Sequence, residues 1–224
     1  MLESEVTLNP VAKIKTLKES AYDEIKKIII AGKISPKIFY SANHFASMLG
    51  ISRTPVREAV MQLESEGFLV LHNGKGFQIK ESSAKEIHDF FEVRKILEIY
   101  LIKNFALKME VSDLEYLQTE LEIMKKYSKD GDSIGFIESD KNFHAYFMKK
   151  STNQFLTNIM GSLQELITIL GIKTVQKLER KDDVIEEHQR ILDALKNNHI
   201  DGAVKALTDH LENTERLLIS QIKE

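Results

Sequence analysis

Apolar residues recur at the spacing of an α-helix through most of the chain, and one short stretch around residue 75 follows a different pattern. In the first 80 residues the helical pattern covers three segments: 20–32, 42–49 and a third from Ser52 or Thr54 to Glu66. Two short apolar runs follow, at 69–71 and 77–79. Between them stands Asn73-Gly74, a pair typical of a two-residue hairpin turn. The pattern predicts three short helices followed by a β-hairpin.

From Ser83 onward the pattern is helical throughout, with Gly131 as a break. Six helices are expected, at 83–108, 112–129, 133–150, 153–178, 181–197 and 200–223. Their expected N-caps include Ser112, Ser133 and Asp201. About 140 residues can bury a core of their own as a helical bundle. We therefore expect an N-terminal arm at 1–17, a small domain at 18–80 and an all-α bundle at 83–224.

The third segment has the features of a DNA-recognition helix. Thr54 is its expected cap, and Pro55 suits the first helical position because proline lacks the N–H that is unpaired there. Arg57 faces outward and Arg53 lies at the helix entry, whereas the inward positions are apolar: Val56, Val60 and Leu63. In a helix-turn-helix such a helix enters the major groove, where arginine can bind guanine bidentately. The fold class predicted is mostly α, with an N-terminal winged helix-turn-helix and a C-terminal all-α bundle.

Charge is distributed unevenly along the chain. The net charge of −3 argues, by itself, against a nucleic-acid binder. Residues 11–80 nevertheless carry a net charge of +5, and the rest of the chain carries −8. Taken singly, Arg53 and Arg57 are more often solvated surface charges. Three helices and a hairpin within one basic segment favour DNA binding, with His72 and Lys75 placed to reach phosphate or the minor groove.

Residues 20–80 resemble the DNA-binding domain of the GntR family of bacterial transcription regulators. The resemblance rests on 21–22, 30–36, 63–67, Gly76 and above all Leu49-Gly50-Ile51-Ser52-Arg53-Thr54-Pro55-Val56-Arg57-Glu58-Ala59. It implies that Arg53 and Arg57 read bases, and that Ser52, Thr54 and the wing around Gly74 and Gly76 approach the backbone or the minor groove. The chain departs from the family pattern twice. Lys37 replaces a glycine, and Asn43 stands where one branch has a DNA-contacting arginine, which leaves the operator sequence open.

Four polar residues of the expected bundle form a candidate metal site. Asp140 and His144 are four residues apart and project from one helix face. His188 and His210 each lie eleven residues from His199, at the turn between the last two helices, so both stand about 16 Å from that turn. Imidazole and carboxylate together suit Zn, Ni, Mn or Fe(II). Spacing alone also allows four unrelated residues, with Asp140 and His144 as a surface pair.

Residues 84–220 resemble the FCD ligand-binding domain, the usual partner of this DNA-binding domain in one large GntR branch. The matching segments are 91–98, 140–144, 151–153, 187–195 and 201–211. In metal-binding members the ligands are one Asp and three His, and the resemblance assigns these roles to Asp140, His144, His188 and His210. Six helices would place the chain in the branch with the smaller domain.

Arg94 is a candidate effector-binding residue. It lies on an apolar stripe, where a charge without a partner is costly. It either forms an intrahelical ion pair with Glu98 or binds the carboxylate of an effector inside the bundle. The other histidines are assigned to the wing, the surface and a turn rather than to the metal: His44, His72, His88 and His199.

These observations predict a DNA-binding transcription regulator, a repressor, that binds a pseudo-palindromic operator as a homodimer. A small organic carboxylate would control it from a divalent-metal site in the bundle. Alternatives are that the metal itself is the signal, that it is purely structural, or that the bundle is a metalloenzyme, for which no catalytic motif appears. The chain has no cysteine, no membrane-spanning stretch and an acidic start unlike a signal peptide, so a cytoplasmic protein is expected. The resemblance implies that the cytoplasm is bacterial.

Overall fold

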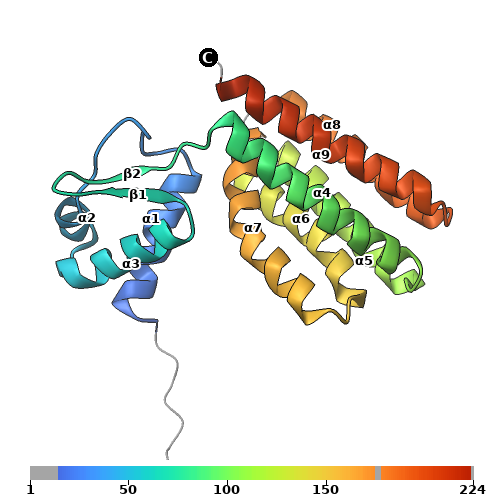
Figure 1. Ribbon diagram of the computed structural model, residues 1–224, viewed down its shortest axis with the longest axis horizontal. Coiled ribbons are helices and arrows are strands. Elements are labelled where there is room, and N and C mark those ends of the chain that lie inside the picture. Colours follow the sequence, from blue (N-terminus) through green and yellow to red (C-terminus); the bar gives the residue numbers. More distant parts are fainter. Residues whose placement is uncertain (1–14, 175–177, 223–224) are drawn as a thin grey trace, which may run out of the picture. The chain divides into compact units, whose positions relative to one another are not determined.

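The computed structural model describes residues 15–174 and 178–222, which include nine α-helices, one short 3-10 helix and two strands (Figure 1). The chain forms two compact units, with the main boundary between Ile79 and Lys80. Residues 30–33 belong to the second unit. Most of the expected N-terminal arm, residues 1–14, lies outside the described residues. The last part of that arm is helical, because the first helix begins at Leu17.

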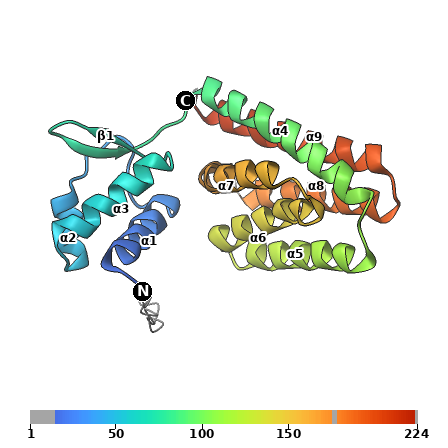
Figure 2. The same ribbon diagram turned by 60° about the horizontal axis from the view of Figure 1, so that its bottom comes forward.

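Three helices and a hairpin build the first unit (Figure 2). They are α1 (Leu17–Ile30), α2 (Ala42–Leu49), α3 (Arg53–Ser65), β1 (Leu69–His72) and β2 (Gly76–Ile79). Gly50 ends α2 with a φ of 66°, and its N–H is bonded to carbonyls of the last turn. This left-handed cap turns the chain directly into α3, because glycine adopts positive φ without steric cost. The predicted helix-turn-helix is therefore present, followed by the predicted hairpin.

Two details of these helices differ from expectation. Ser52, and not Thr54, precedes α3 as the N-cap, and Pro55 is the third helical residue. Proline is tolerated there because the N–H groups of the whole first turn lack intrahelical partners.

The hairpin turn has three residues, 73–75, rather than the two expected. His72 pairs with Gly76, and the N–H of Lys75 donates to the carbonyl of His72 at 3.1 Å. Both Gly74 and Gly76 have positive φ, 75° and 102°. Gly76 leaves no room for a side chain, because a Cβ at this position would lie 2.1 Å from the carbonyl oxygen of Tyr40. Tyr40 forms two backbone hydrogen bonds of 2.8 Å with Phe77, and this bridge fixes the base of the wing.

We predict that Gly76→Ala destabilises the N-terminal unit by about 3 kcal/mol, because the methyl group meets backbone and the φ is unfavourable for an L-residue. Gly74→Ala is the matched control. It has the positive φ but no atom within 4 Å of its Cβ, so about 1 kcal/mol is expected. Urea unfolding of both variants measures the difference. Equal losses would show that the close approach to Tyr40 does not limit this position.

The second unit is an all-α bundle. Its elements are α4 (Ala84–Ala106), α5 (Val111–Lys129), α6 (Ser133–Tyr146), η1 (Phe147–Lys150), α7 (Gln154–Thr174), α8 (Leu178–Lys196) and α9 (Ile200–Ile222). Helices α8 and α9 form a hairpin, α4 packs along α9, and α5 packs against both α6 and α8 (Figures 1 and 2). The core contains five fully buried phenylalanines: Phe91, Phe105, Phe136, Phe143 and Phe147. No helix in the described part of the bundle or of the first unit has the length and hydropathy of a membrane span.

The six expected helices are present, with shifted ends. Acidic side chains replace two of the expected serine caps, since Glu110 precedes α5 and Asp132 precedes α6. Asp201 lies inside α9 rather than before it. The helix expected at 133–150 tightens to a 3-10 turn over its last four residues, and α8 begins three residues earlier than expected. The helix expected to run to residue 178 is described to Thr174, and residues 175–177 lie outside the described part.

Candidate functional site

The first candidate site is a groove between the recognition helix and the wing. Its volume is about 490 Å³. Arg53 and Arg57 line it from α3, and His72, Gly74, Lys75 and Gly76 line it from the hairpin. Ser52 and Thr54 are exposed at the start of α3 but do not line the groove. The structure thus brings together six of the eight residues that the sequence proposed for DNA binding.

The fold holds the basic groups of this groove outward. Arg57 is exposed, whereas Val56 and Ala59 are buried, and the buried Val60 lines the groove together with Arg57. Lys75 lies over the ring of Phe39, with its Nζ 5.5 Å from the ring centroid. That ring also packs edge-on against His72. Side chains that the sequence reasoning left out of the DNA site also line the groove, notably Asn43 and Met61. Neither carries a charge, and for Asn43 the signal was its position, where one branch of the family has a DNA-contacting arginine.

The second candidate site lies inside the bundle, where α6, α8 and α9 meet. Asp140 and His144 come from α6, His188 from α8 and His210 from α9. All four are buried, and one donor atom from each lies within 4.8 Å of all the others. The Nε2 atom of His188 is 3.2 Å from Nε2 of His144 and 3.3 Å from Oδ1 of Asp140. The predicted pairing across the last helical hairpin is present, with the rings of His188 and His210 4.6 Å apart.

Each histidine of this cluster is oriented by an acceptor on its outer side. Nδ1 of His144 donates to Glu98 Oε2 at 2.6 Å, and Nδ1 of His188 donates to the carbonyl of Val184 at 2.8 Å. Nδ1 of His210 donates to Glu187 Oε2 at 2.8 Å. A neutral imidazole that donates through Nδ1 presents a lone pair at Nε2. These outer bonds therefore direct three lone pairs toward the cluster, an arrangement typical of metal-binding histidines.

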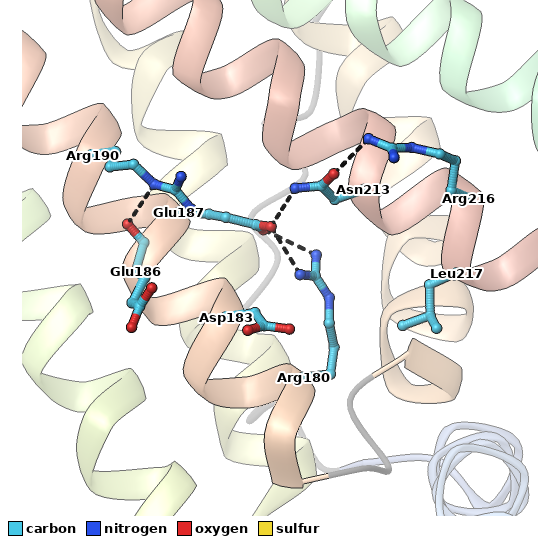
Figure 3. Close-up of a pocket in the computed structure, with 8 residues that line it drawn as sticks. All are labelled: Arg180, Asp183, Glu186, Glu187, Arg190, Asn213, Arg216 and Leu217. Carbon is cyan, nitrogen blue, oxygen red and sulfur yellow. Dashed lines mark hydrogen bonds and ion pairs between the residues drawn. The ribbon is translucent and has the colours of Figure 1, made fainter.

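Glu187 is itself held in place from the surface side. Arg180 donates to both of its oxygens, at 2.9 and 3.0 Å, and Asn213 donates to Oε1 at 2.7 Å (Figure 3). A pocket of about 370 Å³ lies over these groups. Sequence reasoning missed Glu187 and Arg180 as supports for His210. The adjacency of Glu187 to His188 was visible, but adjacent helical residues point in different directions, so nothing in the sequence connected Glu187 to His210.

The electrostatics of the cluster favour the protonation state that binds metal. Burial, together with the neighbouring His210, lowers the pKa of His188 to about 3 against the opposing effect of Asp140. Burial also lowers the pKa of His210. For Asp140, burial raises the pKa, but His144, His188 and His210 outweigh it and hold the pKa below its ordinary value. An ionised Asp140 beside unprotonated His188 and His210 is a donor set for a cation.

The donor chemistry fits a metal ion. The Nε2 atoms of His144 and His188 lie 3.2 Å apart, and they lie 4.0 and 3.3 Å from Oδ1 of Asp140. When both rings are neutral and protonated at Nδ1, no hydrogen lies between these three acceptor atoms. Such acceptors repel unless a cation lies among them. Within the described residues these four form the one group with spacing suitable for a metal ion. Three imidazoles and a carboxylate suit several divalent metals and do not select one.

Arg94 forms the intrahelical ion pair, one of the two roles expected for it. It is 4% exposed, and its Nε donates to Glu98 Oε1 at 2.5 Å, so the intrahelical ion pair is present. The other oxygen of Glu98 accepts from His144. Burial raises the pKa of Glu98, but Arg94 and His144 hold it far below its ordinary value. Arg94 Nη2 is buried and has no hydrogen-bond partner in the described structure, so one donor is left for a ligand.

The remaining histidines lie outside the cluster. His88 pairs with Glu215 at 2.6 Å on the surface of the bundle. His199 is exposed at the turn before α9, and His72 belongs to the wing.

Comparison with known proteins assigns each of the two units to a known domain family. The model of the bacterial regulatory proteins of the GntR family matches residues 17–79, and the FCD domain model matches residues 89–213. LutR, a transcriptional regulator of Bacillus subtilis, is 29% identical over 204 residues, which cover 82% of this chain and 92% of LutR. The gluconate operon transcriptional repressor of the same organism is 25% identical, with 96% of this chain and 91% of the repressor covered.

A solved structure agrees with the fold over both units. Escherichia coli McbR/YncC is 21% identical, with a TM-score of 0.74 over 93% of this chain and all of that chain. Together with the groove of α3 and the wing, these matches identify a DNA-binding transcription regulator and not an enzyme. The chain belongs to the GntR family of bacterial regulatory proteins, with a GntR helix-turn-helix domain followed by an FCD domain.

Proposed function

We propose that this regulator is a repressor whose affinity for its operator is lowered by a small organic carboxylate bound at a metal site in the bundle. The observation that carries the proposal is the convergence of four buried donors, Asp140, His144, His188 and His210. Glu98 links this cluster to Arg94, whose Nη2 is buried and has no partner in the described structure. The metal would supply a positive centre for a carboxylate. Arg94 would donate to the same anion.

The DNA-binding half of the proposal rests on the groove of the first unit. Arg53 and Arg57 would donate to guanine edges in the major groove, and Lys75 at the wing tip would contact phosphate or the minor groove. Ser52 leaves its hydroxyl unused by the helix cap, so it is free to contact the backbone. One helix-turn-helix domain covers only a half-site of an operator. We therefore propose that the protein binds a pseudo-palindromic operator as a homodimer in the bacterial cytoplasm.

The carboxylate can act only if it binds the DNA-competent and DNA-incompetent arrangements with different affinity. Glu98 offers a physical basis for such a difference. It joins Arg94 on α4 to His144 on α6, so an anion that draws Arg94 away alters a bond to a metal ligand. A metal that acts alone as the signal remains the second candidate, because the protein itself provides four ligands.

We expect Arg94→Lys to keep the metal but lose most of the response to acid. Lysine retains the charge that Glu98 needs, but it lacks the second guanidinium nitrogen. Loss of a hydrogen bond to a charged group corresponds to roughly 10- to 100-fold weaker action of the acid. The measurement is fluorescence anisotropy of the metal-loaded protein on an operator selected from random duplexes, titrated with small carboxylic acids.

Arg190→Gln is the matched control, an exposed arginine of the same bundle that should leave the acid response unchanged. Operator binding that responds to metal loading and to no acid would instead establish a metal sensor. Acids that tighten operator binding would contradict the proposed derepression.

A further inference from the structure

The groove between α3 and the wing has an apolar part that the basic residues do not explain. Val60, Met61, Leu71 and Phe77 line it together with the arginines. Val60 and Phe77 are buried and belong to the core of the first unit, whereas Met61 is 56% exposed and Leu71 is 42% exposed. Two large apolar side chains, one from α3 and one from β1, are therefore available to whatever occupies this groove.

Met61 continues the line of arginines along α3. It follows Arg57 by four residues, about one helical turn, so the two side chains are neighbours on the helix surface. The exposed acidic residues of the same helix, Glu58 and Glu64, do not line the groove. The side of α3 that faces the groove is thus cationic in its first two turns and apolar in the third.

The chemistry of DNA limits what an apolar side chain can recognise in the major groove. Base edges there present hydrogen-bond donors and acceptors, and their one apolar group is the C5-methyl of thymine. Methionine is unbranched and flexible, so it can pack against a methyl group without a fixed geometry. Four helical residues advance about 6 Å along the axis, which corresponds to roughly two base pairs of DNA.

We infer that Met61 recognises the methyl group of a thymine within about two base pairs of the guanine bound by Arg57. This inference rests on the proposed docking of α3 in the major groove, and it is independent of the metal and the acid. Met61 would add a preference for thymine that neither arginine provides. Leu71, on the wing side of the groove, would help to exclude water from the contact.

Replacement of thymine by deoxyuracil tests the inference, because it removes the methyl group and leaves base pairing unchanged. Operators are selected from random duplexes with the full-length wild type, and each thymine of a half-site is then replaced in turn. At one position the wild type should bind the uracil duplex about 4-fold more weakly, or about 15-fold when both half-sites are changed, as expected for burial of one methyl group per half-site. Fluorescence anisotropy at a fixed salt concentration measures these ratios.

Substitutions at Met61 should change the same ratio. Met61→Ala should bind the thymine operator about as weakly as the wild type binds the uracil operator, and it should not distinguish the two. Met61→Leu keeps an apolar side chain and should retain the preference for thymine. Met48→Ala is the matched control, because Met48 is 67% exposed on α2 but does not line the groove, and its ratio should equal that of the wild type.

The outcomes separate this inference from the proposed function. If the wild type binds uracil and thymine duplexes equally at every position, the methyl contact is refuted. If Met61→Ala weakens both duplexes equally, Met61 contacts the DNA backbone or supports the fold, and the inference is also refuted. Either result leaves Arg57 as the residue that binds guanine. If the wild type selects no sequence from the random duplexes, the proposed sequence-specific binding fails, and this inference with it.

Discussion

Arg57→Ala is expected to abolish sequence-specific DNA binding without disturbing the fold. The side chain is exposed in the first turns of α3 and lines the groove, while the neighbouring Val56 and Val60 form the core contact. A bidentate contact with guanine contributes about 1–3 kcal/mol. In a symmetric dimer the contact is lost twice, so we expect specific affinity to fall by about 30-fold to 10⁴-fold.

Anisotropy titrations on a selected operator and on a scrambled duplex, at a fixed salt concentration, measure this effect. Lys75→Ala is the contrasting variant, because a contact with phosphate carries no sequence information. It should weaken both duplexes similarly and lower the salt dependence of binding by about one unit per subunit. An equal loss on both duplexes for Arg57→Ala would show that Arg57 contacts the backbone rather than a base.

His188→Ala is expected to reduce bound metal from about one ion per chain to almost none. His188 is central to the cluster, because its Nε2 lies 3.2 Å from His144 and 3.3 Å from Asp140, and its ring packs on that of His210. The remaining residues would offer two imidazoles and a carboxylate, and the vacated space would admit water. We expect metal affinity to fall by several orders of magnitude, more than the 10- to 100-fold typical for loss of an outer hydrogen bond.

Elemental analysis of the purified chain measures this loss, with His199→Ala as the control because that histidine is exposed at a turn of the same bundle. Thermal unfolding gives an independent readout. Added metal should raise the melting temperature of the wild type and of His199→Ala but not of His188→Ala, since only a ligand that binds the folded state stabilises it. Full metal content in His188→Ala, or a folded wild type that cannot be loaded, would contradict the metal site. The effector pocket would then rest on Arg94 alone.

The sequence by itself was sufficient for the fold class and for the helix-turn-helix and wing that carry the proposed DNA-binding residues, because both depend on local information. The turn between α2 and α3 needs the left-handed Gly50, and the outward direction of Arg57 follows from the apolar residues at Val56 and Val60. Helical periodicity also placed His188 and His210 at equal heights in a hairpin, since a constant rise per residue converts chain distance into height. The wrong predictions concerned local details. Ser52 and not Thr54 caps α3, the wing turn has three residues and not two, and acidic residues precede α5 and α6 in place of the expected serines.

Only the tertiary structure decided which side chains meet between helices that are distant in sequence. Periodicity gives the face of a helix but not its rotation against a neighbour, so it could not show that Glu98 supports His144 or that Glu187 supports His210. It offered an ion pair or an effector clamp for Arg94, and packing left one nitrogen bonded to Glu98 and another without a partner.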